Sequence, residues 1–301
     1  MNSKRGITFA LLTSAREADG FRSLTFPAFR HLLDFNADSL ETLAIGASEQ
    51  DVPVGLVLAA RNRNSKEAEL VSIYVGPASR GKRVAQGLLE RLETYACERG
   101  VVALRAVFVT GQPTTAALET VFTRRGFGQP ELRMYVTHFS VESLSQAPWV
   151  KGRRLPAGME IVDWATLGEP LREELCASLA AEAWAPKDLV PFDHERDCDA
   201  QTSTALLVAG QVRGWSINHR VAGKLRFTCV YVHPALQASG RLFLLYAESY
   251  RRMKMLGINE CMGTVPAKHA AHAAFAQRWM KPYTTSFGES REVRKPLSKN
   301  I

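Results

Sequence analysis

An internal repeat is the feature of this sequence that most restricts how the chain can fold. When the chain is shifted by 157 residues, residues 69–78 align with residues 226–235, and both segments contain Tyr-Val-x-Pro-Ala. The same shift places Leu88 on Leu245. Self-similarity at a fixed offset indicates repeated structural units. We therefore expect two units with the same order of elements, with two unrelated α/β domains as the alternative.

The hydrophobic pattern predicts the same elements in both copies. In the first copy we expect strands at residues 7–15, 43–48, 54–62, 69–75, 101–109 and 132–139, and helices at 16–35 (interrupted near Pro27), 84–99 and 113–125. In the second copy we expect strands at residues 159–163, 205–209, 212–220, 224–232 and 258–265, and helices at 171–184, 241–256 and 267–279.

These elements predict an α/β (α+β) fold in which each unit is a mixed sheet flanked by helices. The expected domains are residues 1–142 and 158–301. Residues 143–157, rich in Ser, Pro, Gly and basic residues, are expected to form the linker between them.

Composition limits the function classes. The 301 residues are 46% hydrophobic and 23% charged, and no apolar run reaches the roughly 18 residues that span a bilayer. Five scattered cysteines without a Cys-x-x-Cys pair predict neither a zinc site nor a disulfide framework, and favour a cytoplasmic protein. The net charge of +8 fits nucleic acid, an anionic surface or a polyanionic small molecule. Because the basic residues are dispersed, we expect no nucleic-acid partner and no membrane.

A basic loop in the first copy connects a hydrophobic strand to a helix. The N terminus of a helix carries unpaired N–H groups and a partial positive charge, so it attracts anions. Gly81 lets the backbone approach a ligand closely, and Ala85 keeps the first helical turn free of bulk. The cations of the loop are Arg80, Lys82 and Arg83. The loop therefore predicts a diphosphate site, with a solvated basic loop as the alternative.

Residues 69–89 resemble the acetyl-CoA-binding motif of the GNAT superfamily, Gln/Arg-x-x-Gly-x-Gly/Ala after a strand that ends in Val-x-Pro. Arg80 and Ala85 match its first and last positions, whereas Arg83 stands where the motif has glycine. The resemblance implies tandem GNAT domains that use acetyl-CoA or another short acyl-CoA as co-substrate. The cofactor-binding residues that it implies are Ile73, Tyr74, Val75, Arg80, Gly81, Lys82, Arg83, Val84, Ala85, Thr115 and Phe122.

The rest of the motif is incomplete in both copies. Residues 115–127 are similar to the family's next helix, but Phe122 stands where a tyrosine is usual. In the second copy Gln237 and Gly240 match the phosphate motif, while Leu242 fills the position of Gly or Ala, and Phe275 that of the tyrosine. The resemblance thus implies that the first copy binds acyl-CoA and that the second is degenerate.

Direct attack of an amine on the thioester needs a general base and a stabilised leaving thiolate. Glu69 matches a position where family members carry the base, and alternation predicts that it shares a face with Val71 and Ile73. The alternative is an edge glutamate without a catalytic role. Tyr74 is a weak candidate for the acid, and Tyr135 or water could replace it. Because the pKa of a thiol is about 8.5, the thiolate can also leave without full protonation.

The resulting hypothesis is an N-acyltransferase that acts on an amine of a small-molecule acceptor, and the resemblance implies transfer of an acetyl group. An inactive GNAT-fold ligand-binding or scaffolding protein is the alternative, and related acyl-CoA chemistry such as decarboxylation is a third. His269 and His272 lie three residues apart, which alone is a weak metal pattern, so no metal is predicted. The tryptophans of the second half are expected in the core. Neither the acceptor nor the oligomeric state follows from the sequence.

Overall fold

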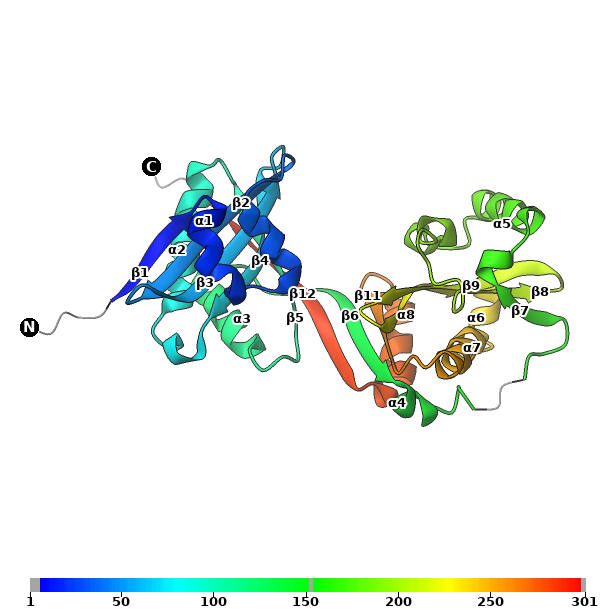
Figure 1. The fold of residues 1–301 in the computed structure, drawn as a ribbon. Coiled ribbons are helices and arrows are strands. Elements are labelled where there is room, and N and C mark those ends of the chain that lie inside the picture. The colour runs from blue at the N-terminus through cyan, green and yellow to red at the C-terminus, as the bar shows by residue number, and fades with distance from the viewer. Residues whose placement is uncertain (1–5, 152–153, 299–301) are drawn as a thin grey trace, which may run out of the picture. The chain divides into compact units, whose positions relative to one another are not determined.

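The computed structural model describes residues 6–151 and 154–298. Within these ranges no helix is both long and apolar enough to cross a membrane. The chain divides into two compact units, residues 1–133 with 290–301 and residues 134–289 (Figure 1). Each unit is a mixed sheet with helices packed on it, as the sequence predicts.

The first unit has six strands in the spatial order β1-β2-β3-β4-β5-β12. Only β4 and β5 are parallel to each other. The strands are β1 (Ile7–Leu12), β2 (Leu40–Glu49), β3 (Val52–Asn62), β4 (Glu67–Val75), β5 (Ala103–Val109) and β12 (Ser286–Pro296). The helices are α1 (Ala15–Ala18), α2 (Val84–Glu98) and α3 (Thr115–Arg124), with 3-10 segments η1 (Asp19–Leu24), η2 (Pro27–Asp34) and η3 (Pro77–Ser79).

The second unit repeats this plan in the order β6-β11-β10-β9-β8-β7. Its strands are β6 (Glu131–Ser140), β7 (Met159–Asp163), β8 (Thr204–Val208), β9 (Gln211–Val221), β10 (Lys224–Val232) and β11 (Glu260–Pro266). Its helices are α4 (Val141–Ser145), α5 (Glu169–Glu182), α6 (Pro234–Gln237), α7 (Leu242–Met255) and α8 (Ala270–Phe275), followed by a π-helical turn at Ala276–Met280. Short 3-10 segments lie at Trp164–Thr166, Lys187–Leu189, Pro191–Asp193 and Lys281–Tyr283.

The closing strands of the two units are exchanged, so the unit boundaries differ from the expected 1–142 and 158–301. The C-terminal strand β12 pairs with β5 of the first unit, with Val293 opposite Ala106. Strand β6, expected to close the first unit, pairs with β11 of the second, with Phe139 opposite Cys261. Both β5 and β11 need an antiparallel neighbour, and the hydrophobic pattern of a strand does not say which of two equivalent edges it joins.

The segment expected to be a linker, residues 143–157, belongs largely to the second unit. Leu144 and Trp149 are buried in its core, and the indole N–H of Trp149 donates to the carbonyl of Trp279 at 3.2 Å. Residues 152 and 153 of this segment lie outside the described part of the chain. Although this segment is mostly polar in sequence, its two buried apolar side chains hold it in the core of the second unit.

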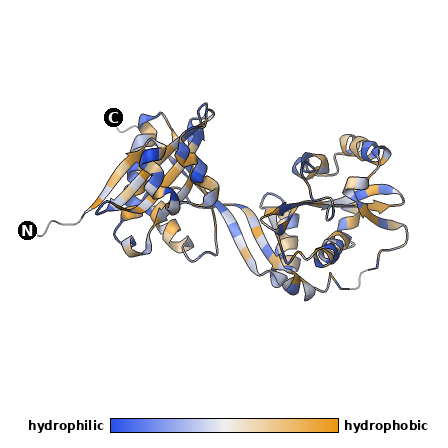
Figure 2. Ribbon diagram, in the orientation of Figure 1, coloured by the Kyte–Doolittle hydropathy of each residue, from blue (hydrophilic) through white to orange (hydrophobic). Residues whose placement is uncertain are grey.

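Hydrophobic residues recur along the strands of the first sheet (Figure 2), and two clusters of buried side chains include residues of these strands. Leu88 and Leu92 of α2 pack on one face, and Phe21 and Leu33 of the 3-10 segments pack on the other. Full burial of one such side chain contributes about 1.5–3 kcal/mol. This two-sided packing holds β4 and its following loop in place.

Tryptophan rings dominate the core of the second unit, as expected from the sequence. Trp164, Trp184 and Trp215 are buried, and the rings of Trp184 and Trp215 lie 5.2 Å apart. Trp279 is the exception among the predicted core tryptophans, because 41% of it is exposed.

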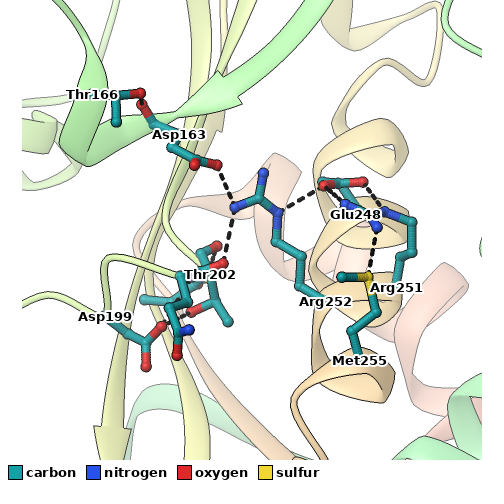
Figure 3. Close-up of polar contacts among 10 residues, drawn as sticks. Asp163, Thr166, Asp199, Thr202, Glu248, Arg251, Arg252 and Met255 are labelled. Atoms are coloured by element: carbon teal, nitrogen blue, oxygen red, sulfur yellow. Dashed lines mark hydrogen bonds and ion pairs between the residues drawn. The ribbon is translucent and has the colours of Figure 1, made fainter.

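An ionic network joins α7 to the far end of the second sheet (Figure 3). The guanidinium of Arg252 donates to Glu248 at 2.7 Å and to the carbonyl of Gln201 at 2.9 Å, and it lies 2.6 Å from Asp163. Only 13% of the Arg252 side chain is exposed. One arginine therefore connects a helix, a loop and the end of β7.

The repeat inferred from the sequence is confirmed by a matching irregularity in the two sheets. In β4 the register shifts between Leu70 and Ser72, which makes Val71 the extra residue of a β-bulge. In β10 the register shifts between Phe227 and Cys229, which makes Thr228 the extra residue. Val71 and Thr228 are 157 residues apart, the offset of the sequence repeat.

Candidate active site

The parallel strands β4 and β5 separate partway along their length. They pair only from Glu67 opposite Ala103 to Leu70 opposite Ala106, whereas β4 continues to pair with β3 as far as Val75. The separation begins at the bulge of β4, since a bulge bends the strand and increases its twist. The last residues of β4 therefore have an edge that β5 does not cover.

The backbone groups on this edge follow from the hydrogen bond that ends the β3–β4 ladder. Gly76 N–H donates to Val54 carbonyl oxygen at 2.8 Å. Because successive backbone groups alternate in direction along a strand, the N–H groups of Ile73 and Val75 point toward the separated edge. Such fixed N–H groups are the kind of donor that stabilises a developing oxyanion.

The loop after β4 brings a helix N terminus to the same end of the sheet. Helix α2 begins at Val84, with no side chain capping its N terminus and no acidic residue in its first turn. Gly81 has a φ of 79°, and a Cβ placed on it would meet no atom within 4 Å. Backbone conformation, not lack of space, is therefore the reason for glycine at this position.

Arg83 immediately precedes α2 and has a left-handed conformation, with a φ of 61°. This is the position where the GNAT motif has glycine. A left-handed conformation costs a non-glycine residue about 1–2 kcal/mol. The loop therefore keeps the backbone path that the motif's glycine allows, with a cationic side chain in place of hydrogen.

The other two cations of the loop have partners at the ends of strands β4 and β2. Arg80 Nε donates to the carbonyl of Val75 at 3.1 Å. Lys82 Nζ donates to the two carboxylate oxygens of Glu49 at 2.8 and 2.9 Å, and Ser79 Oγ donates to Glu49 at 3.1 Å. The hydrogen bond from Lys82 lowers the pKa of the Glu49 carboxyl. Arg80 thus fixes the loop to the strand, while Lys82 is partly neutralised.

Glu69 does not share a face with Ile73, so this part of the sequence prediction is wrong. Ala68 and Leu70 contact the α2-side core before the bulge, and Ile73 contacts it after the bulge. The extra residue Val71 shifts the alternation by one, which places Glu69 and Ile73 on opposite faces.

Glu69 forms an ion pair with Arg105, the residue directly opposite it on β5. Arg105 also lies 3.5 Å from Glu292 on β12. A guanidinium next to a carboxylate favours its charged form and competes for the oxygen that would accept a proton. Glu69 is thus a positioned carboxylate whose use as a base requires one oxygen to remain accessible beside Arg105.

The two predicted residues of α3 differ in exposure, because Thr115 is partly exposed and Phe122 is buried. Thr115 Oγ1 accepts a hydrogen bond from Gln112 N–H at 3.1 Å, which organises the start of the helix. Phe122 is only 2% exposed, and its ring lies 5.9 Å from that of Phe108 and 4.9 Å from that of Phe127. Phe122 is therefore a core residue. Because phenylalanine lacks the hydroxyl of the motif's tyrosine, its ring can be buried without a hydrogen-bond partner. Tyr74, by contrast, is 38% exposed.

The second unit reproduces this arrangement with other side chains. Strands β10 and β11 pair from Leu225 opposite Cys261 only as far as Phe227 opposite Gly263. Gln237 Nε2 donates to the carbonyl of Val232 at 3.2 Å, the counterpart of the contact between Arg80 and Val75.

His272, which the sequence analysis did not assign to a site, lies beside the separated strands of the second unit. It helps to line a cavity of about 310 Å³ there, the cleft of the second unit. The sequence signal that could have identified His272 is its position three residues before Phe275, which places both residues on the same face of a helix.

Comparison with known proteins agrees with this architecture. Residues 9–127 match the acetyltransferase (GNAT) family model. A tandem GNAT protein from the clavulanic acid biosynthesis pathway is similar in structure, with a TM-score of 0.59 and 13% identity, covering 98% of this chain and 100% of that one. A GCN5-related N-acetyltransferase from Sphaerobacter thermophilus has a TM-score of 0.60 and 18% identity, covering 100% and 98%. No curated protein is significantly similar in sequence.

These findings define the fold of the protein. Residues 9–127 of its first unit match the model of GNAT acetyltransferases, and the chain as a whole has the tandem GNAT fold.

Proposed function

We propose that the first unit binds an acyl-CoA, with acetyl-CoA as the expected form, and transfers the acyl group to an amine of a small molecule. The observation that carries this proposal is the separation of β4 from β5 beside the uncapped first turn of α2. The edge of β4 offers hydrogen-bonding groups to an extended amide chain, and the helix N terminus offers N–H groups to a diphosphate.

In this proposal different residues of the first unit bind the acyl-CoA and promote the transfer. The N–H groups near Ile73 and Val75 polarise the thioester carbonyl, and Arg80 holds the loop in shape through Val75. Arg83 supplies charge for the phosphates. Glu69 is the candidate general base, and Tyr74 the candidate acid for the leaving thiolate.

Binding is tested by isothermal titration of the full chain with acetyl-CoA. Ala85→Leu copies the second unit, where Leu242 begins the helix, and is expected to reduce affinity at least tenfold by crowding the first turn. Val102→Leu, at a position that is 48% exposed between the end of α2 and the start of β5, is the matched control. Absence of binding to the wild type, or equal binding by Ala85→Leu, would refute this location.

Transfer is tested separately by release of free thiol over a panel of amino acids, aminosugars and polyamines. Glu69→Gln is expected to lower kcat and to leave KM nearly unchanged, whereas a loss of binding would raise KM. The same assay decides the second candidate function, a ligand-binding module without transfer. The ion pair of Glu69 with Arg105 and the burial of Phe122 favour that second candidate. Thiol release that depends on an amine would exclude it.

A further inference from the structure

The second unit contains a cavity that the proposed function does not use. Its volume is about 310 Å³, at the lower end of the roughly 300–1,000 Å³ typical of small-molecule sites. It lies where β10 leaves β11, against the loop from α6 to α7 and against α8. The aromatic side chains that line it are Tyr231, Phe243, His272, Phe275 and Trp279.

The loop that lines this cavity is poorly suited to a diphosphate. Leu242 lines the cavity and begins α7, where the first unit has Ala85 one residue into α2. From residue 237 to residue 242 the loop carries a single cation, Arg241, whereas the first unit has three cations from residue 80 to residue 85. Both steric fit and charge therefore disfavour the ligand proposed for the first unit.

The aromatic lining is already organised for ring contacts. The rings of Tyr231 and His272 meet edge to face with centroids 5.7 Å apart, and those of Phe243 and Phe275 lie 5.1 Å apart. Aromatic pairs favour edge-to-face or offset contacts at about 4.5–7 Å, because the ring face is negative and the edge positive. A flat aromatic ligand would extend this cluster, whereas a saturated ring would gain only apolar contact.

His272 supplies polar atoms to this otherwise apolar lining. Within the described part of the chain its imidazole makes ring contacts, with Tyr231 and with His269, and no hydrogen bond. Burial is the main cause that lowers its pKa, the charge of His269 lowers it further, and Asp188 opposes both. A neutral imidazole has one N–H donor and one nitrogen acceptor.

We propose that this cleft binds an uncharged small molecule whose aromatic or heteroaromatic ring carries an N–H or O–H group, with the His272 imidazole as its hydrogen-bond partner. The site is independent of the acyl-CoA site proposed for the first unit, because every residue that lines it belongs to the second unit.

The test uses phenol as the probe and cyclohexanol as the matched control, which has the same donor but no aromatic ring. Phenol, like tyrosine, ionises only at about pH 10. In NMR titrations of the full chain at pH 7, phenol is expected to shift the His272 imidazole resonance saturably, and cyclohexanol is expected to leave it unchanged. The resonance is assigned by its loss in His272→Phe. Saturation-transfer NMR should show phenol binding to His272→Phe about 2- to 10-fold more weakly, the effect of one net hydrogen bond.

A cavity-filling variant locates the binding. Ala271 lines the cavity and is exposed, so Ala271→Trp is expected to abolish phenol binding without disturbing the core. Ala274 is exposed on the same helix and does not line this cavity, so Ala274→Trp is expected to bind phenol as the wild type does.

Three results would overturn the proposal. The first is no shift of His272 with phenol, and the second is an equal shift with cyclohexanol. The third is a shift caused by coenzyme A in the chain carrying Ala85→Leu, which would make this cleft a cofactor site. Because the acyl-CoA proposal is tested at Ala85 and this one at His272 and Ala271, failure of either leaves the other standing.

Discussion

Arg83 and Gly240, 157 residues apart, hold the same left-handed backbone conformation, with φ values of 61° and 67°. Each lies in the loop that enters the helix after the separated strand of its unit. Glycine adopts this conformation without strain and arginine does not. The two units thus share one backbone path, and only the second has the residue that the path favours.

Arg83→Gly is expected to stabilise the first unit by about 0.5–1 kcal/mol, because relief of the left-handed strain exceeds the extra freedom that glycine gains when unfolded. Chemical denaturation with fluorescence detection measures the change. Arg83→Ala, which removes the charge but keeps a Cβ, is the control and should not stabilise. Equal stabilisation by both variants would show that charge, not conformation, is responsible.

Val293→Ala tests the strand exchange. Val293 is 2% exposed and belongs to the core of the first unit, although it lies near the C-terminal end of the chain. Loss of two buried methyl groups and the resulting cavity should cost the first unit about 2–3 kcal/mol. Hydrogen exchange should show faster opening of β5 amides with little change in β9. Val221→Ala, at a position that is 43% exposed, is the control. Loss of protection in β9 would contradict the observed pairing.

Arg252→Met tests the ionic network of Figure 3. The change keeps the apolar stem but leaves Asp163 and the carbonyl of Gln201 without the guanidinium, so we expect a loss of about 2–3 kcal/mol in the second unit. Arg251→Met is the matched control, because Arg251 contacts the same Glu248 but is 55% exposed, and exposed pairs contribute about 0–1 kcal/mol. Equal losses in thermal unfolding would contradict a special role for Arg252.

Asp188 predicts a pH dependence of the second unit. Burial raises the pKa of Asp188, but hydrogen bonds from Lys268 and His269 outweigh it and set the pKa at about 2, below the ordinary 3.8. A carboxyl whose pKa is lowered by folding contributes stability that is complete above pH 3.8 and is lost as the pH falls through about 2. The difference in unfolding free energy between wild type and Asp188→Asn should therefore shrink as the pH falls from about 4 to 2. Asp197→Asn, at an 88% exposed position, is the control and should have the same unfolding free energy as the wild type across this pH range.

Local sequence patterns predicted most elements because the cause of those elements is local. The apolar stripe of α2 and the β-like run of β4 are each contained in one segment, so residues 84–99 and 69–75 were predicted within two residues of the observed bounds. The two bulges, at Val71 and Thr228, are separated by the same 157 residues as the sequence repeat.

The site residues were predicted less completely because side-chain direction depends on neighbouring strands. The bulge at Val71 reversed the face of Glu69 relative to Ile73, and no signal in the sequence of β4 alone marks that bulge. Phe122 occupies the expected helix position but points into the core. His272 lines a cavity only because α8 packs beside the separated end of β10.

The sequence by itself determined two copies of a strand–loop–helix unit, because hydrophobic period, the Tyr-Val-x-Pro-Ala repeat and the loop glycines all act within short segments. Tertiary structure alone decided which unit receives each closing strand. Strands β6 and β12 are both antiparallel partners for an equivalent sheet edge, so the choice rests on the packing of Val293 and Phe139 in separate cores, which the hydrophobic pattern of neither strand specifies.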